Sequence, residues 1–240
     1  VRSSAASDVY KRQVLEDFFS AQKDLEKKKI LITAGPTYEK IDPVRFIGNY
    51  SSGKMGFALA EACAERGAEV TLVAGPVSLK THHPAIKRID VESAGEMYQA
   101  AMTAFPSSDA AILCAAVADY RPENASEQKI KRETEREMTL HLVPNPDIAA
   151  SLGAIKREGQ VMVGFALETN DEATHAEGKL KRKNLDFIVL NSLRDQGAGF
   201  RCDTNKITII DNAGGVTSYP LKTKREVACD IVNKLVTLLK

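Results

Sequence analysis

A long polar segment near the start of the chain holds residues whose types and spacing suit ligand chemistry. It runs from Gly35 to Gly56, reads GPTYEKIDPVRFIGNYSSGKMG, and is too long and too polar for a simple connector. Its stretch Gly48–Lys54 comes within one residue of the phosphate-binding pattern GxxxxGK[ST]. Met55 stands where that pattern needs a magnesium-binding hydroxyl, so we do not expect a true P-loop. A Ser-Ser-Gly run that opens a helix would still offer backbone N–H groups to an anion.

Two side chains in the same segment point to binding rather than to helix capping alone. A glycine-rich helix cap would explain Ser51–Gly53, but it would not explain Arg45 and Asn49. A GxGxxG pattern is missing after Ala34, which counts against an NAD(P)-dependent dehydrogenase. We therefore treat Arg45 and Asn49 as candidate ligand-binding residues.

A second group of candidates follows the apolar run Ala110–Val117. Asp119 comes directly after this run, where an acidic residue either caps a helix or binds a ligand. The residues Tyr120–Pro122 behind it do not start a helix, which favours binding. Lys129 and Lys131 alternate on an extended segment and so share a face, although a solvated strand edge is the favoured explanation when this segment is considered alone.

Two further clusters have both a structural and a functional interpretation. Asn145-Pro146-Asp147 is a compact helix start, and helix capping alone would explain it. Lys179 and Lys183 lie one helical turn apart on a basic segment, so they face the same way. They could hold a triphosphate together, or they could be the solvated, dipole-complementing end of a helix.

The elements that must position these residues alternate between strand and helix. Such alternation predicts an α/β fold with a Rossmann-like, mostly parallel sheet, helices on both of its faces, and ligands beyond the carboxyl ends of the strands. The predicted strands are Ile30–Ala34, Glu69–Ala74, Ile86–Val91, Ala110–Val117, Val161–Phe165 and Phe187–Leu190. The predicted helices are Met55–Arg66, Ala94–Phe105, Ile148–Lys156, Ala173–Lys183 and Arg225–Leu239. Lys129–Leu142 and Lys206–Tyr219 are predicted as added β-hairpin arms, with Gly214-Gly215 as the turn of the second.

Composition fits one globular α/β domain and excludes several classes of protein. The net charge of +1 gives no reason to expect nucleic acid or a membrane surface as partner, and no apolar run is long enough to span a bilayer. The four cysteines lie far apart without a CxxC pair, which fits a reducing, cytoplasmic setting. Residues 1–13 have no apolar period and are expected to be disordered or non-native, and residues 14–29 to form an amphipathic linker helix.

Taken in order, the motifs resemble the phosphopantothenate–cysteine ligase family of coenzyme A biosynthesis. The matching segments are ILITAGPTYEKIDPVRFIGNYSSGKMG, AAVADYRP with QKIKR, VPNPDIAAS, and GFALETN with KLKRKNLD. The resemblance runs from about Leu25 to Lys240, so residues 30–240 are expected to be the ligase domain. The preceding helix resembles the linker that joins this ligase to a flavin-dependent decarboxylase, which would be fused upstream or act in trans.

The resemblance implies a two-step reaction between CTP, 4′-phosphopantothenate and cysteine. The substrate carboxylate would attack CTP to give an acyl-cytidylate and pyrophosphate, and the cysteine amine would then displace CMP. Mg²⁺ would arrive with the triphosphate, and no all-protein metal site is expected. The nucleotide site would fall on Leu113, Cys114, Ala115, Asp119, Lys129, Pro146, Asp147, Ile148, Ala149, Phe165, Lys179 and Lys183.

The resemblance also implies which residues carry the chemistry. Asn49 and Ala115 would contact phosphopantothenate, and Lys129 would act from a mobile flap over the reacting centre. Family members are dimers with shared sites, so Arg45 would reach in from the second subunit of a homodimer. Two rival functions remain open, an NAD(P)-linked oxidoreductase on the same fold and a non-catalytic dimerisation or binding module.

Overall fold

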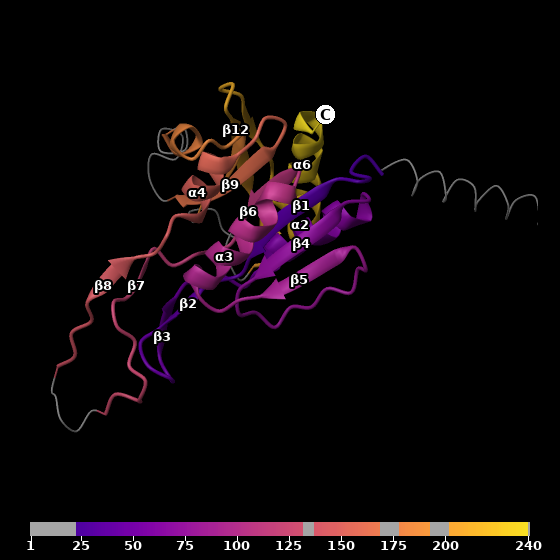
Figure 1. The fold of residues 1–240 in the computed structure, drawn as a ribbon. Helices are drawn as coiled ribbons and strands as arrows, with labels where there is room; N and C mark the ends of the chain where they lie inside the picture. Colours follow the sequence, from indigo (N-terminus) through magenta and orange to yellow (C-terminus); the bar gives the residue numbers. More distant parts are fainter. Residues whose placement is uncertain (1–22, 132–136, 169–177, 193–201, 240) are drawn as a thin grey trace, which may run out of the picture.

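An eight-stranded sheet forms the centre of the molecule in the order β13-β12-β10-β9-β6-β1-β4-β5 (Figure 1). The structure, a computed structural model, describes residues 23–131, 137–168, 178–192 and 202–239. The sheet consists of β1 (Lys29–Ala34), β4 (Glu69–Ala74), β5 (Ile86–Asp90), β6 (Ala110–Leu113), β9 (Val161–Glu168), β10 (Phe187–Ser192), β12 (Ile207–Asp211) and β13 (Val216–Ser218). The six strands from β5 to β10 are parallel to one another, whereas β12 and β13 are antiparallel to their neighbours.

Helices cover both faces of this sheet, as the alternating sequence predicts. Because successive strand residues point to opposite faces, Ile30 and Ile32 of β1 belong to one core and Leu31 to the other. The first core packs against α2 (Lys54–Glu65) and α6 (Lys224–Leu238). The second packs against α3 (Ala94–Ala104) and α4 (Ile148–Ile155). The expected Rossmann-like architecture is therefore confirmed.

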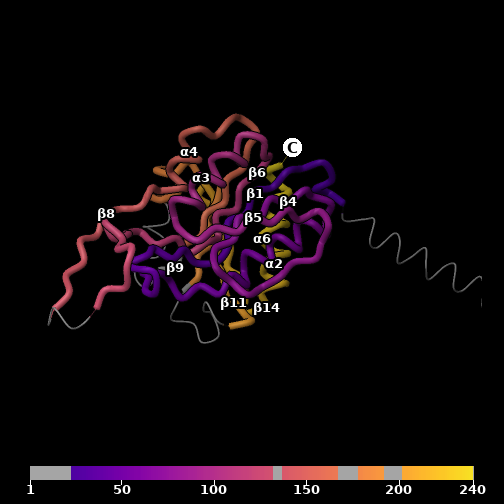
Figure 2. Tube along the Cα trace, turned by 60° about the horizontal axis from the view of Figure 1, so that its bottom comes forward, coloured from indigo at the N-terminus to yellow at the C-terminus, as the bar shows by residue number. Residues whose placement is uncertain are grey.

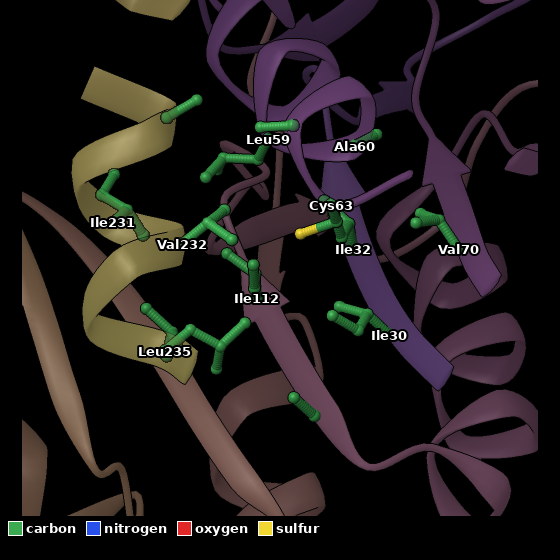
Figure 3. Close-up of a cluster of buried hydrophobic side chains, with 14 of the residues drawn as sticks. Ile30, Ile32, Leu59, Ala60, Cys63, Val70, Ile112, Ile231, Val232 and Leu235 are labelled. Carbon is green, nitrogen blue, oxygen red and sulfur yellow. The ribbon is translucent and has the colours of Figure 1, made fainter. Parts of the chain in front are cut away.

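The first core is densely filled by side chains from two helices and the sheet (Figure 3). Leu59 of α2 and Ile231, Val232 and Leu235 of α6 are all 0% exposed, and they converge over Ile112 of β6. Full burial of one such side chain stabilises the fold by about 1.5–3 kcal/mol. The helix α6 begins with a complete capping box, in which the Thr223 and Glu226 side chains each accept from the other's backbone N–H.

Three short antiparallel ladders lie outside the central sheet. They pair β2 (Tyr38–Lys40) with β3 (Phe46–Gly48), β7 (Tyr120–Pro122) with β8 (Leu142–Pro144), and β11 (Thr204–Asn205) with β14 (Lys222–Thr223). A 3₁₀ turn, η1 (Phe105–Ser107), follows α3. The chain between β7 and β8, whose described residues are 123–131 and 137–141, is called the arm below. It stands away from the sheet in both views (Figures 1 and 2).

Most predicted elements agree with the observed ones, and the disagreements gather around the arm and the loops. The predicted hairpin over Lys129–Leu142 is wrong, because its described residues form no ladder with one another and pairing occurs at the base, between β7 and β8. The predicted strand Ala110–Val117 ends as a ladder at Leu113, and beyond it an isolated bridge joins Ala116 to Pro36. The loop after Ala34 contains the β2–β3 ladder, which the sequence did not indicate.

The hairpin predicted over Lys206–Tyr219 is confirmed, with Gly214 in the left-handed region of its turn. It extends the main sheet instead of forming a separate arm, and Ile210 of β12 is buried in the second core. Residues 14–22 of the predicted linker helix lie outside the described residues, and Lys23–Lys28 is a turn. Of the predicted helix Ala173–Lys183, residues 178–182 are helical and 173–177 lie outside the described residues. Within the described ranges no helix is both long and apolar enough to cross a membrane.

Candidate functional site

A pocket of about 820 Å³ opens at the carboxyl ends of β1, β6, β9 and β10. This is where parallel open sheets place their ligands, because the connecting loops diverge at that edge. Twelve of the residues predicted from the sequence line its wall. They are Asn49, Leu113, Cys114, Ala115, Asp119, Pro146, Asp147, Ile148, Ala149, Phe165, Lys179 and Lys183.

The segment after β6 becomes a pocket wall because the loop after β1 holds its backbone. The Ala115 N–H donates to Oγ1 of Thr33 at 3.3 Å, and the Ala116 N–H donates to the Gly35 carbonyl at 2.9 Å. Nδ2 of Asn49 donates to the Ala116 carbonyl at 3.1 Å and to the Val117 carbonyl at 3.2 Å. In this conformation the Asn49 amide donors bind the protein itself, so a substrate carboxyl would have to replace one of these two carbonyls.

The opposite wall is fixed by the helix start at residues 145–147. Nδ2 of Asn145 donates to the Ala118 carbonyl at 2.9 Å, and its N–H donates to the Asp119 carbonyl at 2.8 Å. Asp147 caps α4 by accepting from the Ala150 N–H at 3.0 Å, so the capping interpretation of this motif is confirmed.

Lys183 and Asp147 form an ion pair on this wall, with 3.0 Å between Nζ and Oδ2. Burial opposes ionisation of Asp147, but the N–H of Ala150 and the Lys183 ammonium outweigh it and hold the pKa of this carboxyl below its usual value. Lys183 is therefore kept at the pocket by a permanent negative charge. Lys179 lines the same wall, one helical turn earlier.

The start of α2 supplies a further part of the wall. Gly53, the N-cap residue, has φ of +76°, and no side chain caps the helix. A Cβ at Gly56 would lie 2.5 Å from the Cβ of Ala34, so only glycine lets α2 approach β1 this closely. Ser51, Ser52, Gly53 and Lys54 all line the pocket, which fits an anion-binding helix start even though the P-loop pattern is incomplete.

Two pocket lysines were not singled out from the sequence. Lys54 pairs with Asp203 at 2.6 Å, and Nζ of Lys224 donates to the Cys202 carbonyl at 2.6 Å. Burial lowers the pKa of Lys224, and the neighbouring charge of Lys54 lowers it further. In the sequence, Lys224 resembled an ordinary first-turn residue of a helix, and only the packing of α6 reveals its place at the pocket.

Four lysines thus approach the pocket from both faces of the sheet. Lys54 and Lys224 belong to α2 and α6 on the first core, whereas Lys179 and Lys183 come from the segment whose Leu180 packs in the second core. Such a distribution suits an extended polyanion, or two anionic ligands that are bound together, since positive charge is available on either side.

No thiol chemistry is indicated at this site. Burial raises the pKa of the Cys114 thiol to about 12, so the thiol is neutral at physiological pH. In the part of the chain that the structure describes, no group of three or more His, Cys, Asp or Glu side chains could hold a metal ion.

Arg45 and Lys129 are not on the pocket wall in this single chain. Lys129 is exposed on the arm. Arg45 pairs with Asp42 in the turn between β2 and β3, and its Nη2 donates to the Ile130 carbonyl at 2.9 Å. The sequence placed both residues among those of the site, but here they lie together at the arm.

Comparison with known proteins identifies what the chain resembles as a whole. Residues 25–239 match the model of the DNA/pantothenate metabolism flavoprotein C-terminal domain. The chain is 56% identical over 232 residues to a cysteine/cysteine sulfinic acid decarboxylase of an unknown prokaryotic organism, an alignment that covers 95% of this chain and 64% of that protein. It is 49% identical over 225 residues to the coenzyme A biosynthesis bifunctional protein CoaBC of Vibrio parahaemolyticus, which covers 93% of this chain and 56% of that protein.

A solved structure agrees with the fold described above. The crystal structure of the C-terminal domain of coenzyme A biosynthesis bifunctional protein CoaBC superposes with a TM-score of 0.77 at 40% identity, over 90% of this chain and 98% of that one. The chain spans less than two thirds of the length of both curated relatives, but nearly all of this solved domain.

Proposed function

The chain belongs to the family of the DNA/pantothenate metabolism flavoprotein C-terminal domain, and we propose that it is a ligase that joins 4′-phosphopantothenate to cysteine in coenzyme A biosynthesis, with CTP as the activating nucleotide. The observation that carries this proposal is the pocket of about 820 Å³ with lysines from both faces of the sheet. Both the nucleotide and the pantothenate substrate carry phosphate, so the reaction needs a site that tolerates two polyanions at once.

The chemistry proceeds in two balanced steps. A carboxylate oxygen of phosphopantothenate attacks the α-phosphorus of CTP, the bond to the β-phosphate breaks, and pyrophosphate leaves. The amine of cysteine then attacks the acyl carbon, CMP leaves with the bonding electrons, and the amine proton passes to solvent. Activation is required because a free carboxylate has no leaving group that an amine could displace.

The pocket residues divide between the two substrates. We assign the nucleotide to the backbone at residues 113–115, Asp119, the helix start at residues 146–149, Phe165, and the pair Lys179 and Lys183. Asn49 and Ala115 serve phosphopantothenate, with the Asn49 amide turning from the Ala116 and Val117 carbonyls to the substrate carboxyl. Charge on the phosphate oxygens is neutralised by lysines in a site of restricted water, where electrostatic interactions are strong.

Magnesium fits this site as a companion of the triphosphate. Mg²⁺ prefers oxygen ligands and keeps several waters. Asp147 is already bound by Lys183, whereas the Asp119 carboxylate is exposed at the pocket and can donate to a cation held mainly by phosphate oxygens. The ion would supply charge neutralisation on the triphosphate.

The active form is proposed to be a homodimer in the cytoplasm. Most exposed large hydrophobic side chains of the described residues lie on the β2–β3 turn region or along the arm and its base, namely Val44, Phe46, Tyr50, Tyr120, Met138 and Leu142. A second copy that covers this surface would bury it and carry Arg45 towards a neighbouring pocket. We also propose a flavin-dependent decarboxylase as a partner, fused upstream or acting in trans. The bifunctional relative is long enough to hold a second domain, because this chain covers only 56% of it.

One assay tests this function against its rivals. The protein is incubated with phosphopantothenate, cysteine, Mg²⁺ and either CTP or ATP, and the release of pyrophosphate and of phosphopantothenoylcysteine is followed. We expect both products, and faster release with CTP. Carbon dioxide from cysteine without pyrophosphate would favour the decarboxylase named for the first relative. Absence of any product would favour the rival hypothesis of a non-catalytic dimerisation or binding module.

A further inference from the structure

Asp42 is a buried acid whose two oxygens have different roles. It lies in the turn between β2 and β3, is 2% exposed, and does not line the pocket. Its Oδ1 accepts from the N–H groups of Val44 and Arg45, each at 2.8 Å, which closes the turn. Its Oδ2 accepts from Nε of Arg45 at 2.9 Å, from Nη2 of the same side chain, and from the Ile130 N–H at 3.2 Å.

The Oδ2 interactions bind the arm to the β2–β3 turn. Arg45 completes the contact by donating from Nη2 to the Ile130 carbonyl at 2.9 Å. Both backbone groups of Ile130 are therefore held by an acid–base pair that lies 85–88 positions away in the sequence. A second attachment nearby joins the Ser126 N–H to the Ile41 carbonyl at 2.9 Å.

This clamp determines where Lys129 stands. Lys129 immediately precedes Ile130, so their Cα atoms are about 3.8 Å apart and Lys129 cannot move far while Ile130 is held. The same carboxylate orients the Arg45 guanidinium. One acidic residue thus holds Arg45 directly and the backbone beside Lys129 through Ile130.

We propose that Asp42 is a positioning residue that holds Arg45 and Lys129 as a single unit, so that both cations act on the same anionic ligand. The inference rests on the proposed function, together with the role that the family resemblance implies for Lys129 over the reacting centre. Asp42 touches no ligand itself, because it is buried behind the turn. It acts through the geometry that it gives to the two basic residues.

Closing the turn needs only two of these five interactions. An aspartate that closes a turn uses one oxygen to accept backbone N–H groups, as Oδ1 does here. The three bonds to Oδ2 add nothing to the turn but attach the arm and Arg45. The Arg45 guanidinium and these N–H groups keep the pKa of Asp42 well below its usual value, so the clamp is charged throughout the physiological range.

The test is a double-mutant cycle with Asp42→Asn, Lys129→Gln and the double variant. Asn keeps an acceptor for the turn but presents an NH₂ group to the donors of Arg45 and Ile130, so the clamp is lost. Single-turnover pyrophosphate release measures the activation step, and calorimetric titration measures CTP affinity. We expect Asp42→Asn to slow release by about tenfold to a hundredfold, as a displaced catalytic group does, with CTP affinity changed less than about threefold.

Non-additivity is the decisive readout. If Asp42 acts through Lys129, the double variant should be no more than about twofold slower than Lys129→Gln alone. Rates that multiply would assign Asp42 a purely structural role and overturn the inference while leaving the function of Lys129 intact. A normal rate for Lys129→Gln would overturn the role of Lys129 and the inference with it.

Two further variants guard against misfolding. Asp42→Ser keeps a hydroxyl acceptor for the turn and removes the second oxygen, so it must give the same non-additive result. Asp24→Asn is the matched control, because Asp24 also pairs with Nε and Nη2 of an arginine, Arg66, and neither residue lines the pocket. Its rate should equal that of the unmodified chain. Loss of activity in Asp24→Asn, or an additive cycle with Asp42→Ser, would also overturn the inference.

Discussion

The pocket wall and the arm carry candidate residues of the same chemical types, but they are held in place very differently. The wall is joined to the loop after β1, to the start of α4 and to the two buried cores behind it. The arm has mostly exposed side chains and is attached at its base, at Ser126 and at Ile130. Local stability follows buried contacts, so the wall should open only with the whole fold and the arm at much lower free energy.

The difference shows what a motif can and cannot specify. Residues that follow buried parallel strands reach the pocket because the sheet itself directs them there. Lys129 follows no such strand, and the contact nearest to it is the hydrogen bond from the N–H of the next residue, Ile130, to Asp42. The predictions below test whether wall and arm differ in this way.

The largest effect is expected at Asn49, on the wall. Asn49→Asp replaces the two donors to the Ala116 and Val117 carbonyls with a negative charge that repels both these oxygens and the substrate carboxyl. Turnover should fall by about 100- to 1000-fold, as when one donor to a reacting oxygen is removed, with CTP affinity little changed. Steady-state product formation measures turnover, and calorimetric titration measures CTP affinity. Asn212→Asp on the exposed β12–β13 turn is the control, and a normal rate for Asn49→Asp would remove Asn49 from the chemistry.

Next in size is the loss of the lysine pair on the same wall. Lys179→Ala and Lys183→Ala should each weaken CTP binding by about 1–3 kcal/mol, as for a hydrogen bond to a charged group. The double variant should lose less than the sum, because both contact the same phosphates. Lys181→Ala on the same helical segment does not line the pocket and should bind normally. Unchanged affinity in the first two variants would make this a solvated helix end.

A smaller effect concerns the stability of the wall itself. Gly56→Ala should destabilise the fold by about 1–3 kcal/mol, because its Cβ would collide with that of Ala34 and overpack the core. Denaturant unfolding measures the change. Gly95→Ala in α3 has only Ser93 Oγ at 3.8 Å from its new Cβ, so it should be neutral or stabilise by up to about 1 kcal/mol. Equal behaviour of the two variants would mean that α2 can move away from β1 without cost.

The smallest effect on the free energy of unfolding of a single chain is expected for exposed side chains at the base of the arm and on the edge strand β13. Leu142→Ser and Val216→Ser replace exposed side chains, so each should change the free energy of unfolding of a single chain by less than about 0.5 kcal/mol. Light scattering then distinguishes the two surfaces. We expect Leu142→Ser to weaken a dimer that forms through the arm and Val216→Ser to leave it intact. The reverse result would place the interface on the edge strand β13, and a monomer mass for the unmodified chain would contradict the dimer.

Much of the fold could be predicted because it depends on patterns that are local in sequence. The apolar run of β4 and the turn at Gly214 could each be recognised from the residues of their own segment. The end of β6 was not predictable in this way. Its apolar composition continues to Val117, but its ladder with β1 stops at Leu113, and the point where two strands stop pairing is a property of both segments together.

The same contrast between local sequence patterns and contacts between distant segments explains which site residues could be predicted. Most of the twelve predicted residues reached the pocket because they end or follow strands, or begin α4, at one edge of the sheet, whereas Lys179 and Lys183 reach it from the helical segment 178–182 and the turn after it. Lys224 was missed because its role depends on how α6 packs beside α2, and its sequence context shows only a helix start. The β2–β3 ladder was missed because each of its strands has only three residues and Pro43 lies in the turn between them.

The pairing of α2 with α6 has a consequence for synthesis. The strands β1, β4 and β5 and the helix α2 leave the ribosome early, but Leu59 and Cys63 of α2 face α6, which follows every strand of the sheet in the chain. Until α6 has emerged from the ribosome, the apolar face of α2 in the nascent chain is exposed to water and to other incomplete chains. Chaperones that recognise such faces should therefore stay bound until translation passes Leu235, and ribosomes stalled earlier should release aggregation-prone fragments.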